Sequence, residues 1–371
     1  MKVVITLAAA LFLGAASRSE DWDREGAARY LDERMDVWFA NAKKLKTGAG
    51  ETACVSCHTA LPYALSRPAL RRAMHVTEPT AQETRVIEGI ARRVETYDSH
   101  QPMYDFNDAK KIESRGTEAV LNALILATLN APEEPTRKAF RRLWGTQRAD
   151  GAWDWLDFGL EPFETVDAVY YGAALAAFAA GTARADIASE PDARAAIDKL
   201  RRFLTGNYAA QSLFNRTWLL LASSRFKDVL TRPQRDALAA EIERSQREDG
   251  GWSLATLASW RWSKPEAPFH APGTTDAPLL AQSDGYATGL VVYALQQSGR
   301  SPRHPAVAKG LQWLRAHQAG VPVGSAVHPA WRAHSLNFDR EHGGDKGEPW
   351  RRLFMSDSAT GFAVLALAGS K

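Results

Sequence analysis

The chain has 371 residues, 45% of them hydrophobic, and its 46 basic and 43 acidic side chains leave a net charge of +3. Charges this balanced argue against binding to nucleic acid or to an anionic membrane surface. The length and hydrophobic content allow a large buried core. We therefore expect a globular protein that does not bind nucleic acid.

The chain opens with a lysine at position 2 followed by the apolar residues 3–16. This run is too short to span a bilayer comfortably, and the small residues Ala15 and Ser17 suit a signal-peptidase site. The pattern predicts a secretory signal peptide over residues 1–17, with a retained anchor as the alternative. We expect a protein that is periplasmic or otherwise exported, without a transmembrane segment after signal removal.

Two helices are predicted next. Residues 24–44 are amphipathic, and residues 59–73 form a shorter apolar segment that we expect Pro62 and Pro68 to break. The turn between these helices is residues 54–58, and it contains both cysteines of the chain.

Cys54, Cys57 and His58 form a Cys-x-x-Cys-His motif, the spacing that covalent haem attachment requires. In such a motif both thiols bind the porphyrin and the imidazole is the proximal iron ligand. The motif predicts haem c. The alternatives are a thiol-exchange pair, a zinc site, for which further ligands are missing, and two unrelated structural cysteines.

The sixth iron ligand would come from the turns of the neighbouring repeats. A thioether there would raise the reduction potential and suit electron transfer, whereas an imidazole would lower it. An open sixth position is the third alternative. The candidates are Met103 and His100 in the second turn, and Met355, His342, His328 and His334 in the sixth.

An internal repeat organises the remaining chain. Segments that are apolar on nearly all sides alternate with amphipathic segments, a pattern that predicts an inner and an outer layer of helices. With the first pair, this gives an all-α (α/α)6 toroid over residues 18–371, with the Cys-x-x-Cys-His motif in the first outer-to-inner turn. The alternative is a cytochrome c-like domain at 18–110 followed by a toroid at 111–371. The inner segments include 117–124, 166–175, 215–222, 284–295 and 357–367, and the outer ones 81–97, 135–147, 192–205, 232–246 and 303–317.

The turns at 147–153 and 246–252 both read Gln-x-x-Asp-Gly-x-Trp, and Gln312, Trp313 and Gln318 form a degraded third copy. Glycine permits a tight turn, glutamine can bond to backbone at helix ends, and tryptophan can fill the gap between helix pairs. Over about residues 110–371 the chain resembles the squalene–hopene cyclase and prenyltransferase repeat superfamily. The resemblance implies a helical toroid with a central cavity.

The resemblance does not imply cyclisation, because the chain lacks the Asp-x-Asp-Asp motif of those cyclases, and both cysteines belong to the haem motif. Carboxylates at inner-helix starts are still candidates for catalysis or substrate contact, although stabilisation of the helix dipole is the simpler explanation for them. Trp155 lies outside the repeat pattern and is a further candidate for the pocket. The carboxylates are Glu164, Asp167, Asp284 and Asp357.

These patterns predict a c-type haem protein that transfers electrons to a redox partner protein or oxidises a small molecule, such as an isoprenoid, beside the haem. One alternative is a terpenoid-converting enzyme that uses cavity carboxylates. The other is a non-catalytic module that senses redox state or binds a ligand.

Overall fold

The computed structural model describes residues 22–47, 50–260, 282–337 and 348–369. The predicted signal peptide lies outside these residues. The described chain is mostly helical, which confirms the all-α class. None of its helices is long and apolar enough to cross a membrane.

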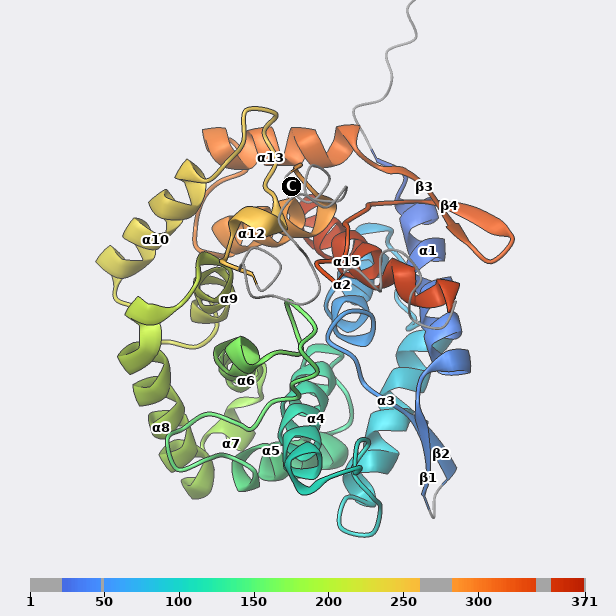
Figure 1. The fold of residues 1–371 in the computed structure, drawn as a ribbon, viewed down its shortest axis with the longest axis vertical. Coiled ribbons are helices and arrows are strands. Elements are labelled where there is room, and N and C mark those ends of the chain that lie inside the picture. Colours follow the sequence, from blue (N-terminus) through green and yellow to red (C-terminus); the bar gives the residue numbers. More distant parts are fainter. Residues whose placement is uncertain (1–21, 48–49, 261–281, 338–347, 370–371) are drawn as a thin grey trace, which may run out of the picture.

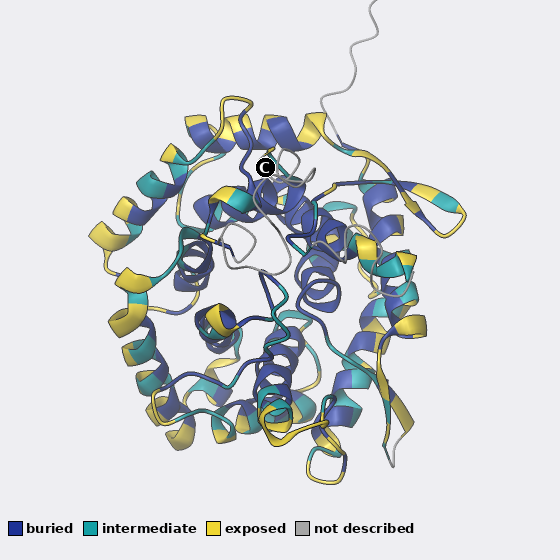
Figure 2. Cartoon of the chain, in the orientation of Figure 1, coloured by how far each residue is buried: buried dark blue, intermediate teal, exposed yellow. Residues whose placement is uncertain are grey.

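Two kinds of helix alternate along the chain. One kind is mostly buried, and the other has an exposed polar face (Figure 2). The buried helices are α2 (Ala60–Ala73), α4 (Asp108–Thr128), α6 (Val169–Thr182), α9 (Leu213–Ser223), α12 (Gly285–Gln297) and α15 (Phe354–Ala368). The half-exposed helices are α1 (Arg24–Asn41), α3 (Ala81–Glu95), α5 (Glu133–Gly145), α8 (Pro191–Asn207), α10 (Arg232–Arg244) and α13 (Pro305–Ala316).

The buried helices form a closed inner ring. Each packs on the next in chain order, from α2 through α4, α6, α9 and α12 to α15, and α15 packs on α2. The half-exposed helices surround them, as Figure 1 shows. The first and last inner helices are therefore neighbours, and α1 also contacts α15.

Helix α2 is continuous, so the break expected at its prolines does not occur. Pro62 lies in the first turn, where no backbone N–H is needed. Pro68 is inside the helix, where proline costs about 3 kcal/mol. The segment tolerates this cost because residues 60–68 are all buried, and the helix packs against both α4 and α15.

The repeated glutamines join neighbouring outer helices. The side-chain amide of Gln147, after α5, donates to Ala196 O in α8 at 3.0 Å, and that of Gln246, after α10, donates to Ala306 O in α13 at 2.8 Å. Gln318, after α13, donates to Asp23 O at 2.9 Å, at the start of α1. The same interaction therefore connects the last outer helix to the first.

The repeated tryptophans are fully buried and bond to the outer helix of their own repeat. The indole N–H of Trp153 donates to Leu143 O at 2.8 Å, and that of Trp252 donates to Ile242 O at 3.0 Å. Trp331 makes the equivalent bond to Leu314 O at 2.8 Å. Trp331, which the motif did not identify, is therefore the tryptophan of the last repeat.

The described strands form two antiparallel hairpins that the sequence analysis did not predict. β1 (Lys44–Thr47) and β2 (Gly50–Ala53) precede the Cys-x-x-Cys-His motif, and β3 (Ala319–Val323) and β4 (Ala326–Ala330) separate Gln318 from Trp331. The hairpin of β3 and β4 is inserted between the glutamine and the tryptophan of the last repeat, which explains why the third copy of the motif is degraded. The remaining short helices are α7 (Ala185–Ala188) and the 3-10 turns Val166–Ala168, Tyr208–Ala210, Leu254–Thr256 and Pro349–Leu353.

Closure of the ring depends on close contact between α15 and α2. A Cβ added at Gly361 would lie 2.7 Å from Pro62 Cβ and 3.0 Å from its carbonyl oxygen. We expect Gly361→Ala to lower the free energy of unfolding by about 1–3 kcal/mol through this overpacking. In the control Gly89→Ala, in α3, the added Cβ meets nothing within 4 Å. Urea unfolding should show that variant unchanged or slightly stabilised, and equal losses in both variants would contradict the contact.

Candidate functional site

The Cys-x-x-Cys-His motif lines a cavity of about 460 Å³, which is also bounded by the end of α1, by α4, by the turns that precede α4 and α6, and by the start of α15. Cys54, Cys57 and His58 all line it. The volume is in the range of small-molecule and cofactor sites. Other residues of its wall are Trp38, Tyr104, Leu156, Phe158, Glu164 and Phe354.

Backbone and side-chain bonds fix the motif between β2 and α2. The Trp38 indole N–H donates to Cys54 O at 2.8 Å. Ser56 Oγ accepts from the N–H groups of Thr59 at 3.2 Å and Ala60 at 3.0 Å, where α2 begins. Because these donors have no partner within the helix, Ser56 acts as its cap. The loop therefore has a defined conformation, and three reactive side chains lie in one cavity.

His58 is held between aromatic rings. Its imidazole stacks on Phe354, the first residue of α15, with centroids 3.7 Å apart and planes at 18°. The Trp38 ring contacts it edge-on at 5.3 Å. His58 is 9% exposed. The orientation of the imidazole is therefore determined by α1 and α15, the first and last helices described here.

A hydrogen-bond relay sets the tautomer of His58. Its Nδ1 lies 3.0 Å from Thr59 Oγ1, and that hydroxyl donates to Asp357 Oδ2 at 2.6 Å. A hydroxyl has one proton, and a carboxylate only accepts. Thr59 must therefore accept from His58, so Nδ1 carries a proton, and in the neutral imidazole the lone pair is then on Nε2.

Asp357 is saturated with donors and 2% exposed. Arg34 donates to both of its oxygens, from Nε at 2.7 Å and from Nη2 at 2.9 Å. Tyr30 Oη donates to Oδ1 at 2.9 Å. Desolvation and the neighbouring carboxylate raise the pKa of Tyr30 well above its usual value. Asp357 lines none of the cavities described here, and it is connected to His58 through Thr59.

Neither cysteine forms a disulfide; Cys57 is buried and Cys54 is half-buried. Desolvation, together with the charge of Glu164, raises the pKa of Cys54 to about 12 and that of Cys57 well above its usual value. The Tyr171 hydroxyl of α6 lies beside the Cys57 sulfur. These thiols are therefore neutral in the folded chain.

The candidates for the sixth iron ligand lie at different places. Met103 is buried in a small cavity that Cys54 and Tyr104 also line. Met355 lines another small cavity, on the side of His58. His100 is occupied by Thr96, with 3.1 Å between Nδ1 and Oγ1, and burial lowers its pKa. His342 lies outside the described residues. His328 bonds to Glu33, and His334 lies near Asp284.

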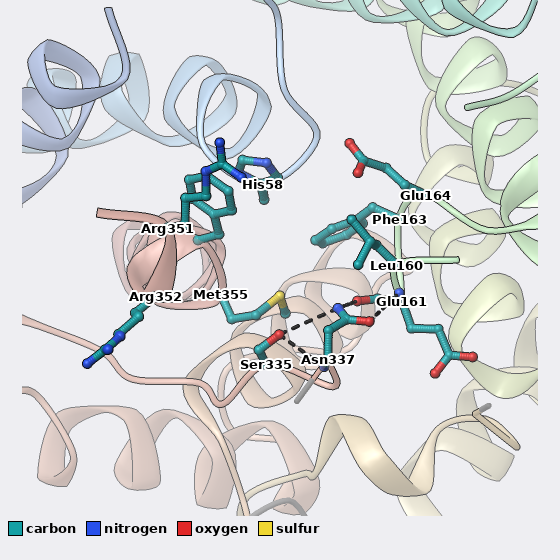
Figure 3. A pocket seen from close by; sticks show the side chains of 11 residues that line it. His58, Leu160, Glu161, Phe163, Glu164, Ser335, Asn337, Arg351, Arg352 and Met355 are labelled. Atoms are coloured by element: carbon teal, nitrogen blue, oxygen red, sulfur yellow. Dashed lines mark hydrogen bonds between the residues drawn. The ribbon is translucent and has the colours of Figure 1, made fainter. Parts of the chain in front are cut away.

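Figure 3 shows the small cavity beside His58. Glu164 and Met355 line it together with His58. Asn337 forms its far wall and bonds to the backbone of Glu161, donating to its carbonyl oxygen at 2.7 Å and accepting from its N–H at 3.0 Å. The turn before α6 and the segment that follows β4 are therefore joined beside His58.

The structure separates the four predicted carboxylates. Glu164 alone lines the cavity of the motif. Asp167 is exposed and lines a separate cavity of about 500 Å³. Asp284 caps α12, accepting from Ala287 N at 2.8 Å, and desolvation raises its pKa to about 6. Asp357 supports His58.

Trp155 lines none of the cavities described here. It packs against Gly172 of α6, and its indole N–H donates to Phe163 O at 2.7 Å. Its role is therefore to hold the turn before α6, which carries Glu164.

Aromatic side chains pack together in the middle of the inner ring. The Trp218 ring of α9 lies 5.1 Å from that of Tyr171 and 5.3 Å from that of Phe362 on α15, measured between centroids. Tyr286 of α12 lies 5.6 Å from Phe362 and 5.7 Å from Phe163. These contacts occupy the space where the resemblance implied a central cavity.

Sequence reasoning did not identify Thr59 and Phe354, which contact His58, or Tyr30 and Arg34, which hold Asp357. The only signal was the i, i+4 spacing of Tyr30 and Arg34 on one face of α1, which does not reveal a partner 323 residues away. Comparison with protein-family models finds no match for this chain, and a search of curated proteins finds none significantly similar to it.

Proposed function

We propose that the protein is an exported c-type haem protein built on an (α/α)6 toroid, with the haem at the edge of the inner ring. Cys54 and Cys57 would form the thioether bonds, and His58 Nε2 would bind the iron. The observation that carries this proposal is the arrangement of His58: its Nδ1–H bonds to Thr59, which in the neutral imidazole leaves the lone pair on Nε2, and the ring lines a cavity shared with both thiols. Neutral imidazole with one bonded N–H is the usual form of a metal-binding histidine.

The raised pKa of both thiols favours this function over thiol–disulfide exchange. Exchange needs an accessible thiolate, and catalytic thiols have a lowered pKa. Cys54 and Cys57 have the opposite environment, since burial raises the pKa of both. Among the described residues there is also no cluster of three or more His, Cys, Asp or Glu side chains that could hold a zinc ion. A porphyrin supplies four ligands itself and needs only His58 from this face.

When bound, haem supplies one-electron chemistry at its iron. The chain's own residues orient His58 through Phe354 and Thr59 and exclude water with the walls of the cavity. Glu164 places a carboxylate in the same cavity. We propose that electrons pass between this site and a redox partner protein or a small molecule that reaches the edge of the ring.

The packed aromatic centre counts against the terpenoid-converting alternative, because a polyprenyl chain needs an enclosed apolar cavity. Asp357, a candidate acid for that chemistry, is committed to Arg34, Tyr30 and Thr59.

The test is a pyridine haemochrome spectrum of the full chain produced in a cell that exports it and attaches haem. We expect the spectrum of haem with both vinyl groups saturated, and a mass increase of one haem that survives denaturation. A protein that is folded and exported but has the mass of the bare polypeptide would refute the proposal.

A further inference from the structure

We propose that Asp357 and Thr59 are positioning residues that set the electron donation of His58 and thereby stabilise the oxidised iron. This inference rests on the proposed haem function and adds to it how the site is tuned. It starts from the order of donors and acceptors: His58 Nδ1–H to Thr59 Oγ1 at 3.0 Å, and Thr59 Oγ1–H to Asp357 Oδ2 at 2.6 Å.

The relay has one direction. Two donors of Arg34 and the hydroxyl of Tyr30 occupy Asp357, so its carboxylate oxygens act only as acceptors. The proton of Thr59 points at that carboxylate, which makes Thr59 Oγ1 a better acceptor for His58, because consecutive hydrogen bonds polarise one another. The bond to Thr59 increases the electron density on the imidazole, and a more basic ligand favours ferric over ferrous iron.

Burial makes this relay effective. Asp357, Thr59 and Arg34 are each 2% exposed, and His58 is 9% exposed. Hydrogen bonds are electrostatically stronger in such surroundings than in water. A second bond, from Ser358 Oγ to His58 O at 3.0 Å, fixes the backbone of the histidine to the same turn of α15. Residues 58–59 and 357–358 therefore form one rigid unit at the seam where the ring closes.

The test compares Thr59→Val, which removes the hydroxyl and keeps the shape, with Thr59→Ser, which restores the hydroxyl. We measure the midpoint potential of each haem-loaded protein by spectroelectrochemistry. Thr59→Val is expected to shift the ferric–ferrous equilibrium about tenfold toward ferrous, about 59 mV upward for one electron. Thr59→Ser is expected to stay close to wild type. A Thr59→Val potential equal to wild type, or equal shifts in both variants, would overturn the proposal.

A second measurement keeps the relay testable without haem. Long-range proton–nitrogen NMR correlations of the haem-free full chain report which ring nitrogen of His58 carries the proton. We expect Nδ1–H in wild type and in Thr59→Ser, and loss of that preference in Thr59→Val. A neutral imidazole with its proton on Nε2 alone in the folded wild type would refute the relay. Failure to attach haem, with Nδ1–H still observed, would refute the proposed function and leave the relay standing.

Discussion

Replacing Cys54 and Cys57 together by alanine is expected to abolish covalent haem attachment completely. Both thioether bonds of the proposed site would come from these side chains, and the sequence contains no other cysteine. The fold should survive, because truncating cysteine to alanine removes a single sulfur atom from each position, and Cys54 is only half-buried. Haem staining after denaturing electrophoresis and intact mass measure the attachment, and circular dichroism measures the fold.

The matched control is Val55→Ala, which removes apolar atoms from the same turn and leaves the Cys-x-x-Cys-His pattern intact. Val55 also lines the cavity. We expect this variant to carry one haem per chain. Haem that stays attached in the double cysteine variant would disprove the role of the thiols, and loss of haem in Val55→Ala would assign the defect to the turn.

The largest effect on stability is expected at Arg34. Arg34 and Asp357 form an ion pair in which both side chains are 2% exposed. Arg34→Ala would leave Asp357 buried without a compensating charge, which typically costs about 3–5 kcal/mol. Because Asp357 also holds Thr59, the environment of His58 should change in the same variant. Urea unfolding of the haem-loaded protein measures the free energy, and the haem absorption spectrum measures the second effect.

Arg29 provides the comparison on the same helix. Its ion pair with Glu25, at 3.7 Å, is solvent-exposed, with side chains 57% and 76% accessible. Exposed pairs contribute about 0–1 kcal/mol, so Arg29→Ala should unfold at nearly the wild-type urea concentration. Similar losses in the two variants would show that the Asp357 cluster does not stabilise the ring.

The helices were predictable because burial on all sides and burial on one side leave different patterns in the sequence. The segment predicted at 303–317 is α13 (Pro305–Ala316), and that at 59–73 is α2 (Ala60–Ala73). The hairpins were not predictable in the same way: β1 and β3 are four and five residues long, too short for a clear periodic signal. The insertion of β3 and β4 also concealed that Trp331 belongs to the repeat.

The candidate site was predictable only where its residues are adjacent in the chain. Cys54, Cys57 and His58 form a motif with a chemical meaning of its own. Their surroundings depend on contacts between residues about 300 positions apart, such as Thr59 with Asp357, and a single sequence contains no record of such pairs. The carboxylates illustrate this limit. Asp284 and Asp357 both lie at the start of an inner helix, and that position did not show that Asp284 caps α12 whereas Asp357 bonds to Thr59.

The stacking of His58 on Phe354 has a consequence for biogenesis. An exported polypeptide emerges amino end first, so in the proposed function residues 54–58 would reach the new compartment well before α15, which supports His58. A chain truncated before α15 would keep residues 54–58. It would lose the Phe354 ring, the Asp357 carboxylate and the Ser358 hydroxyl, which position His58. With haem attached as proposed, such a product would have a different haem absorption spectrum from the full chain. The spectrum would therefore report whether the carboxyl end of the molecule is intact.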